Sequence, residues 1–143
     1  PTIETVQLMN AKHGKNHNPS EVAVYKKQAF ERLDHIPNLI QDTLEVFNHY
    51  KASMPIAVGT GSDKQHAQWV LDKHGLLSQL SALVTSDDVA NGKPHPETFV
   101  RAAELMGVDP QFCVVFEDTE MGRKAALDGG MSCFMVENNR LVY

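Results

Sequence analysis

The spacing of apolar residues changes near the middle of the chain. Up to about Tyr50 they recur every three or four positions, whereas from Pro55 onward short continuous apolar runs alternate with helical patterns. The first spacing predicts amphipathic helices, and the second predicts strands separated by helices. Strands without polar alternation are typical of parallel sheets covered on both faces. The predicted fold is therefore α/β, a doubly wound parallel sheet preceded by a helical segment.

Capping residues give the expected ends of the first helices. A helix over 3–12 ends before Gly14, and a second starts after Asn18, with Pro19 in its first position. A third is predicted over 39–50. The expected strands cover 55–59, 82–85, 113–116 and 131–136. Between them, Ser62 and Gln65 predict a capping box for one helix, another begins near Pro96, and Thr119 or Asp118 caps the last.

Composition narrows the class of protein. The chain has 143 residues, a net charge of −5 and no basic patch, which argues against a nucleic-acid partner. It contains no apolar run of about eighteen residues and no apolar segment near its start, so we expect neither a membrane span nor a signal peptide. Cys113 and Cys133 lie in apolar runs. We interpret them as free thiols of a cytoplasmic protein, with a disulfide as the alternative.

Groups suited to phosphate and metal follow three of the predicted strands. Thr60, with Gly61 and Ser62, follows the first strand, Lys93 lies in the loop after the second, and the carboxylates come directly after the third. In a parallel sheet these carboxyl ends meet at one edge, where ligands bind. A hydroxyl and a lysine suit a phosphate, and carboxylates suit Mg²⁺. The sequence therefore predicts phosphoryl-transfer chemistry.

Each of these groups also has an ordinary structural interpretation. The glycine-flanked Thr60 segment can be a phosphate-binding loop or a tight turn between strand and helix. Lys93 can bind an anion or be a solvated surface charge. Glu117 and Asp118 can hold a metal, or Asp118 can cap a helix while Glu117 forms an ion pair.

Four segments together resemble the haloacid dehalogenase superfamily. They read Gly-Thr-Gly-Ser, Gly-Lys-Pro-His-Pro-Glu-Thr-Phe, Val-Val-Phe-Glu-Asp-Thr and Ala-Ala-Leu-Asp-Gly-Gly-Met, and they lie between about Pro55 and Val136. The pattern is most similar to the β-phosphoglucomutase-like branch, which includes sugar-phosphate phosphatases. The resemblance implies that residues 37–143 form the α/β core and that residues 1–36 are the later part of a helical cap.

The resemblance also implies a role for each candidate residue. Thr60, with Gly61 and Ser62, would bind the transferring phosphoryl group, and Lys93 would stabilise the nucleophile and the developing charge. Glu117 and Asp118 would hold Mg²⁺ directly or through water. The substrate would be a small phosphorylated metabolite.

The family's nucleophile is not found in these residues. Members attack with the first aspartate of an Asp-x-Asp-Gly-Thr motif, carried by a strand in the middle of the sheet, and no Asp-x-Asp occurs here. We expect that strand upstream of a truncated or partly recorded chain, in a phosphatase that works through an aspartyl-phosphate. The alternatives are an inactive fragment or pseudoenzyme and a phosphomutase, although phosphomutases carry a lysine where Asp63 stands. The sequence predicts no particular oligomeric state.

Overall fold

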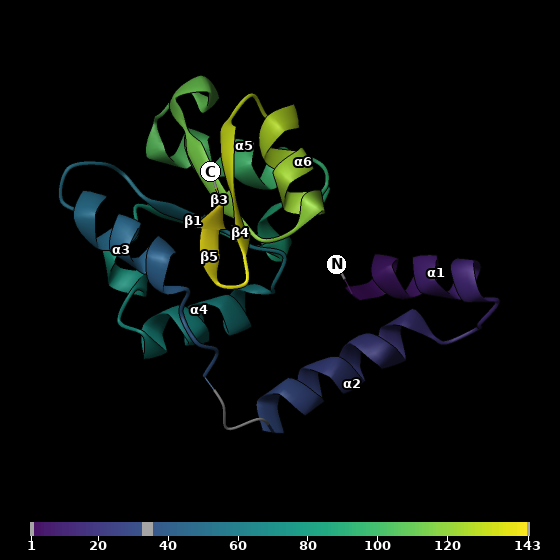
Figure 1. Ribbon diagram of the computed structural model, residues 1–143. Helices are drawn as coiled ribbons and strands as arrows, with labels where there is room; N and C mark the ends of the chain where they lie inside the picture. Colours follow the sequence, from purple (N-terminus) through teal and green to yellow (C-terminus); the bar gives the residue numbers. More distant parts are fainter. Residues whose placement is uncertain (1, 33–35, 143) are drawn as a thin grey trace. The chain divides into compact units, whose positions relative to one another are not determined.

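The computed structural model describes residues 2–32 and 36–142 (Figure 1). The chain forms two compact units, residues 1–36 and 37–143. The helices are α1 (Thr2–His13), α2 (Pro19–Arg32), α3 (Gln41–Tyr50), α4 (Lys64–Lys73), α5 (Glu97–Met106) and α6 (Glu120–Asp128). The strands are β1 (Ala57–Gly59), β2 (Ala82–Val84), β3 (Val114–Glu117), β4 (Ser132–Glu137) and β5 (Arg140–Val142).

The first unit is a pair of packed helices, α1 and α2. The side chain of Asn10 closes their connection, because its amide donates to the His17 carbonyl at 2.8 Å and its oxygen accepts from the His17 N–H at 3.1 Å. Asn18 caps α2 by accepting from the Ser20 N–H at 3.0 Å. The two helices expected here are confirmed. That this unit belongs to a cap domain stays a prediction.

The strands of the second unit form two sheets. β1 pairs with β2 in parallel, with Val58 opposite Leu83, and β3 pairs with β4 in parallel, with Val115 opposite Cys133. The α/β class and the parallel pairing were predicted and are confirmed. The sequence analysis predicted one continuous sheet and did not predict its division into a two-stranded and a three-stranded sheet. Among the described residues β1 and β3 each have a strand partner on one side alone.

β5 is an element that the sequence analysis missed. It runs antiparallel to β4 after a turn in which Asn138 and Asn139 have φ of 51° and 61°. Asparagine tolerates this left-handed conformation better than most residues. The new strand also holds α3, because the Leu141 N–H donates to the Asp42 carboxylate at 3.0 Å.

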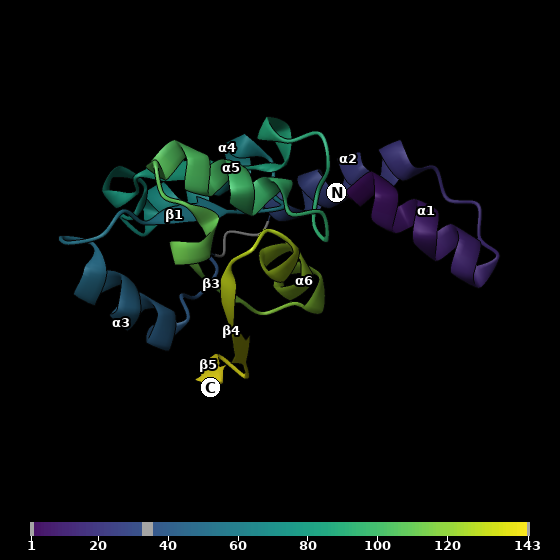
Figure 2. The same cartoon turned by 90° about the horizontal axis from the view of Figure 1, so that it is seen from above.

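Two helices cover the sheets and contact each other. α5 packs on β1 and β2, while α6 packs on β3 and β4 (Figure 2). Small side chains on both helices allow this close packing, and the buried cluster consists of Phe99, Ala103, Ala125, Ala126 and Met131. Both cysteines pack against this cluster as free thiols, as predicted, and burial raises the pKa of each.

The predicted cap of α4 was wrong by one residue. Asp63 is the N-cap, and its carboxylate accepts from the His66 N–H at 2.9 Å. Ser62 instead offers its carbonyl to the Ser86 N–H at 3.0 Å. This second contact ties the loop after β1 to the loop after β2. None of the helices in the described ranges has the length and apolar character needed to cross a bilayer.

Candidate active site

Lys93 connects the carboxyl end of β1 to the carboxyl end of β3. Its Nζ donates to the Gly59 carbonyl at 3.2 Å and forms an ion pair with Glu117. These partners lie 34 and 24 residues away in the sequence. The ammonium group is largely buried, with 16% of its side chain exposed. The convergence of three separate motifs at one edge, expected from the strand pattern, is therefore present.

Glu117 is a buried carboxylate whose oxygens are both engaged. Oε1 accepts from Lys93, and Oε2 accepts from the backbone N–H groups of Asp118 and Thr119, each at 3.0 Å, and from the Thr119 hydroxyl at 2.9 Å. Burial raises the pKa of this carboxyl, but the hydrogen bond and charge of Lys93 and the Thr119 donors outweigh it, so that the net pKa lies below the ordinary value. Glu117 is therefore the fixed counter-charge of Lys93.

The Glu117 carboxylate occupies the space that a side chain at position 122 would fill. A Cβ on Gly122 would lie 1.9 Å from the carboxyl carbon of Glu117 and 2.2 and 2.3 Å from its oxygens. The Gly122 N–H donates to the Thr119 hydroxyl at 3.0 Å, so Thr119 caps α6. Of the two caps considered from the sequence, Thr119 is the one formed. The ion pair considered for Glu117 is also present.

Thr60 directly follows Gly59, whose carbonyl accepts from Lys93. The Thr60 N–H donates to the Val84 carbonyl at 2.9 Å, and its hydroxyl oxygen accepts from the Ser62 N–H at 3.1 Å. The hydroxyl proton is thus left to act as a donor. The backbone amides of Thr60 and Ser62 are thus both hydrogen-bonded within the protein.

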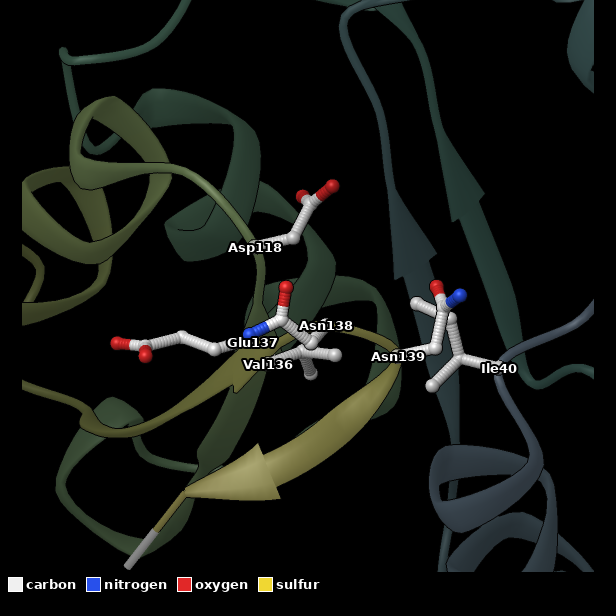
Figure 3. A pocket seen from close by; sticks show the side chains of 6 residues that line it. All are labelled: Ile40, Asp118, Val136, Glu137, Asn138 and Asn139. Carbon is white, nitrogen blue, oxygen red and sulfur yellow. The ribbon is translucent and has the colours of Figure 1, made fainter.

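Asp118 differs from its neighbour because it is exposed. It lines a cavity of about 460 Å³ together with Ile40, Val136, Glu137, Asn138 and Asn139 (Figure 3). Figure 3 shows the Asp118 carboxylate rising from the loop after β3, while the Glu137 carboxylate points in a different direction. Of the two acidic residues that line the cavity, Asp118 is the one that follows β3 directly.

The donor chemistry of this carboxylate fits Mg²⁺, which takes one or two protein carboxylates together with waters and substrate phosphate. Glu117 is committed to Lys93 and Thr119. No cluster of three or more His, Cys, Asp or Glu side chains suited to a metal occurs in the part of the chain that the structure describes. The metal role of Glu117 and Asp118 stays a prediction, with Asp118 as the accessible ligand.

The loop that carries Lys93 is held by a residue that the sequence analysis did not single out. Glu97 accepts from the Ala90 N–H at 2.8 Å, from the Asn91 N–H at 2.9 Å and from the Asn91 amide at 3.0 Å. These donors lower the pKa of the Glu97 carboxyl. Its position four residues after Lys93, at the start of α5, was the available signal.

The sequence profile of the haloacid dehalogenase-like hydrolase family matches residues 4–130. The chain belongs to this family. The resemblance inferred from the motifs is thereby confirmed. An uncharacterised Haemophilus influenzae protein is a relative that is 32% identical over 143 residues, which cover 99% of this chain and 72% of that protein.

A second relative of this haloacid dehalogenase-like chain is the fructose-1-phosphate phosphatase YqaB of Escherichia coli. It is 38% identical over 109 residues, which cover 72% of this chain and 58% of that enzyme. The chain thus spans less than two thirds of that phosphatase. The crystal structure of CbbY from Rhodobacter sphaeroides superposes with a TM-score of 0.81 at 20% identity, over 98% of this chain and 67% of that one. This superposition confirms the fold.

Proposed function

We propose that the gene product containing this chain is a Mg²⁺-dependent phosphatase that hydrolyses a small sugar phosphate. The observation that carries the proposal is the contact of Lys93 with both Gly59 and Glu117. One cation thus lies at the junction of two strand ends, and ligands of open α/β sheets bind at the carboxyl ends of the strands. Membership of the hydrolase family and the similarity to a fructose-1-phosphate phosphatase support the same activity.

The described residues supply donors for a phosphoryl group. Of the three N–H groups of Lys93, two are directed to Gly59 and Glu117, and the third is left for an anion. The Thr60 hydroxyl proton is the second donor. Fixed donors of this kind stabilise the charge that develops on the phosphoryl oxygens in the transition state. Asp118 and Glu117 would hold Mg²⁺ directly or through water, and the metal would supply further positive charge for the phosphoryl oxygens.

We propose that the nucleophilic aspartate lies on a strand that pairs with β1 and β3. In the region with described coordinates, β1 is bonded to β2 alone and β3 to β4 alone. Backbone groups along both remaining edges therefore need partners. A strand between them would end beside Lys93, and the lysine would stabilise its aspartate. The test is the sequence encoded before Pro1, where an Asp-x-Asp at the end of an apolar run is expected.

Hydrolysis is favoured over phosphomutase chemistry by Asp63. Its carboxylate caps α4 by accepting from the His66 N–H at 2.9 Å, close to the loop that carries Thr60. A negative charge here opposes the binding of a second phosphate, which a mutase must hold during its bisphosphate stage. A transferred phosphoryl group would then pass to water. The product would be free phosphate and a dephosphorylated sugar.

The activity is tested with phosphate release from a panel of sugar phosphates, beginning with fructose 1-phosphate. The full-length wild-type gene product should release phosphate with Mg²⁺, and the release should stop when the metal is chelated. Lys93→Ala should lower kcat by about a hundredfold to a thousandfold, because a charged donor to the transition state is lost. Asp118→Asn should raise the Mg²⁺ concentration needed for half activity. Lys124→Ala, which removes an exposed pair on α6, is the matched control and should change neither value.

The competing inactive-protein hypothesis gives a different result. A pseudoenzyme would bind inorganic phosphate in a Lys93-dependent way but release none from any sugar phosphate. Wild-type turnover that Lys93→Ala leaves unchanged would contradict the proposed role of the site, even if the protein proves to be a phosphatase.

A further inference from the structure

The ring of Phe99 lies against the Lys93 ammonium group. The Nζ atom stands over the ring at 4.3 Å from its centroid. Phe99 belongs to the first turn of α5, and 7% of the residue is exposed. An aromatic face attracts a cation at this distance, and the attraction grows when water is excluded. The ring is thus a third partner of the lysine, different in kind from the carbonyl and the carboxylate.

The same ring also supports the end of β1. A Cβ added to Gly59 would lie 3.0 Å from one ring carbon of Phe99 and 3.1 Å from another. A side chain at position 59 would therefore press against the ring, and Gly59 avoids this contact. Because the Gly59 carbonyl accepts from Lys93, the ring touches both the cation and the strand end that binds it.

These contacts restrict where the ammonium group can go. A carboxylate and a carbonyl attract it from two directions, but a long lysine side chain keeps much rotational freedom against them alone. A ring face buried in the core restricts the ammonium group sterically and also stabilises its positive charge. Glu117 and Gly59 accept from the ammonium group, and the ring contacts it as a third partner.

We propose that Phe99 is a positioning residue for phosphoryl transfer, which acts on Lys93 through the electrostatic attraction of its ring. This inference rests on the proposed function, because the lysine is the group that would contact the phosphoryl oxygens. Phe99 itself contacts Lys93 and Gly59. It does more than fill the core, because its ring electronics hold the cation in the orientation that serves an anion.

The experiment replaces Phe99 by phenylalanines with one, two and three ring fluorines, which weaken the negative ring face in steps while nearly keeping the shape. Two quantities are measured, kcat/KM for a sugar phosphate and the acetylation rate of Lys93 by mass spectrometry. The trifluoro variant should lose about threefold to thirtyfold in kcat/KM, with Lys93 acetylation rising in the same order along the series. Equal melting temperatures across the series exclude a folding effect.

Phe47 provides the matched control, because its ring lies under a different lysine, Lys51, whose Nζ is 5.5 Å from the ring centroid. The same fluorine series at Phe47 should leave kcat/KM and Lys93 acetylation unchanged. Lys93 acetylation that stays flat across the Phe99 series would overturn the inference, whatever the activity. Acetylation that rises in a protein without any phosphatase activity would support the positioning role and contradict the proposed function instead.

Discussion

At the scale of single residues, Gly122 decides whether Glu117 can occupy its place. We predict that Gly122→Ala destabilises the protein by about 1–3 kcal/mol, since the new methyl group overlaps the Glu117 carboxylate and the buried pair must shift. Phosphate release should fall in parallel, because Lys93 loses its counter-charge. Urea unfolding and the phosphatase assay measure the two effects.

Gly61→Ala is the control for stability. An added Cβ there has no heavy atom within 4 Å, and Gly61 is absent from the positive-φ glycines among the described residues. We expect its unfolding midpoint to match that of the wild type. If Gly122→Ala is as stable as Gly61→Ala, the close packing of Glu117 on Gly122 is not the arrangement in solution.

At the scale of elements, the loop before α5 depends on Glu97. We predict that Glu97→Gln speeds amide hydrogen exchange at Ala90 and Asn91 by about tenfold, because charge-assisted hydrogen bonds to both amides are weakened. Glu104→Gln, an exposed change on the same helix, should leave these rates unchanged. Equal rates in the two variants would show that the carboxylate does not hold the loop.

We predict that low pH also opens the loop before α5. Asp88, whose pKa is lowered mainly by the Thr85 hydroxyl, and Glu97, whose pKa is lowered mainly by the Ala90 N–H, both bind protons less readily when folded. Their contribution is complete above the ordinary values of 3.8 and 4.5 and is lost as the pH falls through the lower folded values. Amide exchange followed from about pH 6 to about pH 3 should show the loop opening near the acid end. Protection that is constant over this range would contradict the prediction.

Periodicity was sufficient to predict most of the elements. The helix α1 and the starts of α2 and α5 follow from apolar spacing and local caps, which act within a few residues. β5 was missed because a strand of three residues is too short to show an alternation of apolar and polar positions. The Asn138-Asn139 pair between apolar runs was nevertheless a hairpin signal. The cap of α4 was misassigned because Ser62 and Asp63 are both good caps and tertiary contacts use the first elsewhere.

The sequence was sufficient to propose which residues form the candidate site, but not to predict the contacts between them. The strand pattern predicted Thr60 and Glu117 after the carboxyl ends of two parallel strands and Lys93 in the loop after a third, all at one edge of the sheet. The ion pair of Lys93 with Glu117, and the ring of Phe99 beneath the cation, join residues that no local pattern relates. Likewise, the space at Gly122 becomes visible only when the Glu117 carboxylate has a position. No local pattern separates the buried role of Glu117 from the exposed position of Asp118.

At the scale of the whole molecule, the sheets leave apolar surface exposed. On β3 and β4, Val114 is 50% exposed, and the rings of Phe116 and Phe134 stack with centroids 5.8 Å apart while staying 36% and 37% exposed. This surface adjoins the β3 edge that has no strand partner in the described part of the chain. Exposed edges with apolar side chains favour pairing between molecules.

We therefore predict that a polypeptide of these 143 residues self-associates and binds a hydrophobic dye. Val114→Lys should lower both effects severalfold, because a charge at the edge opposes strand pairing. Leu105→Lys, a change at a 57% exposed position on α5, is the control and should alter neither. Sedimentation equilibrium and dye fluorescence provide the measurements. A monomer that binds no dye would show that the surface is covered in solution.

The partners of Lys93 are synthesised at different times, so the contacts of the site form in a fixed order. Gly59 leaves the ribosome 34 residues before the lysine, whereas Glu117 follows it by 24 residues, and Gly122 comes later still. A nascent chain that has folded its first sheet therefore carries a lysine whose counter-charge does not yet exist. The Lys93–Glu117 ion pair, and with it the fixed position of the ammonium group, can therefore form only after β3 has been made.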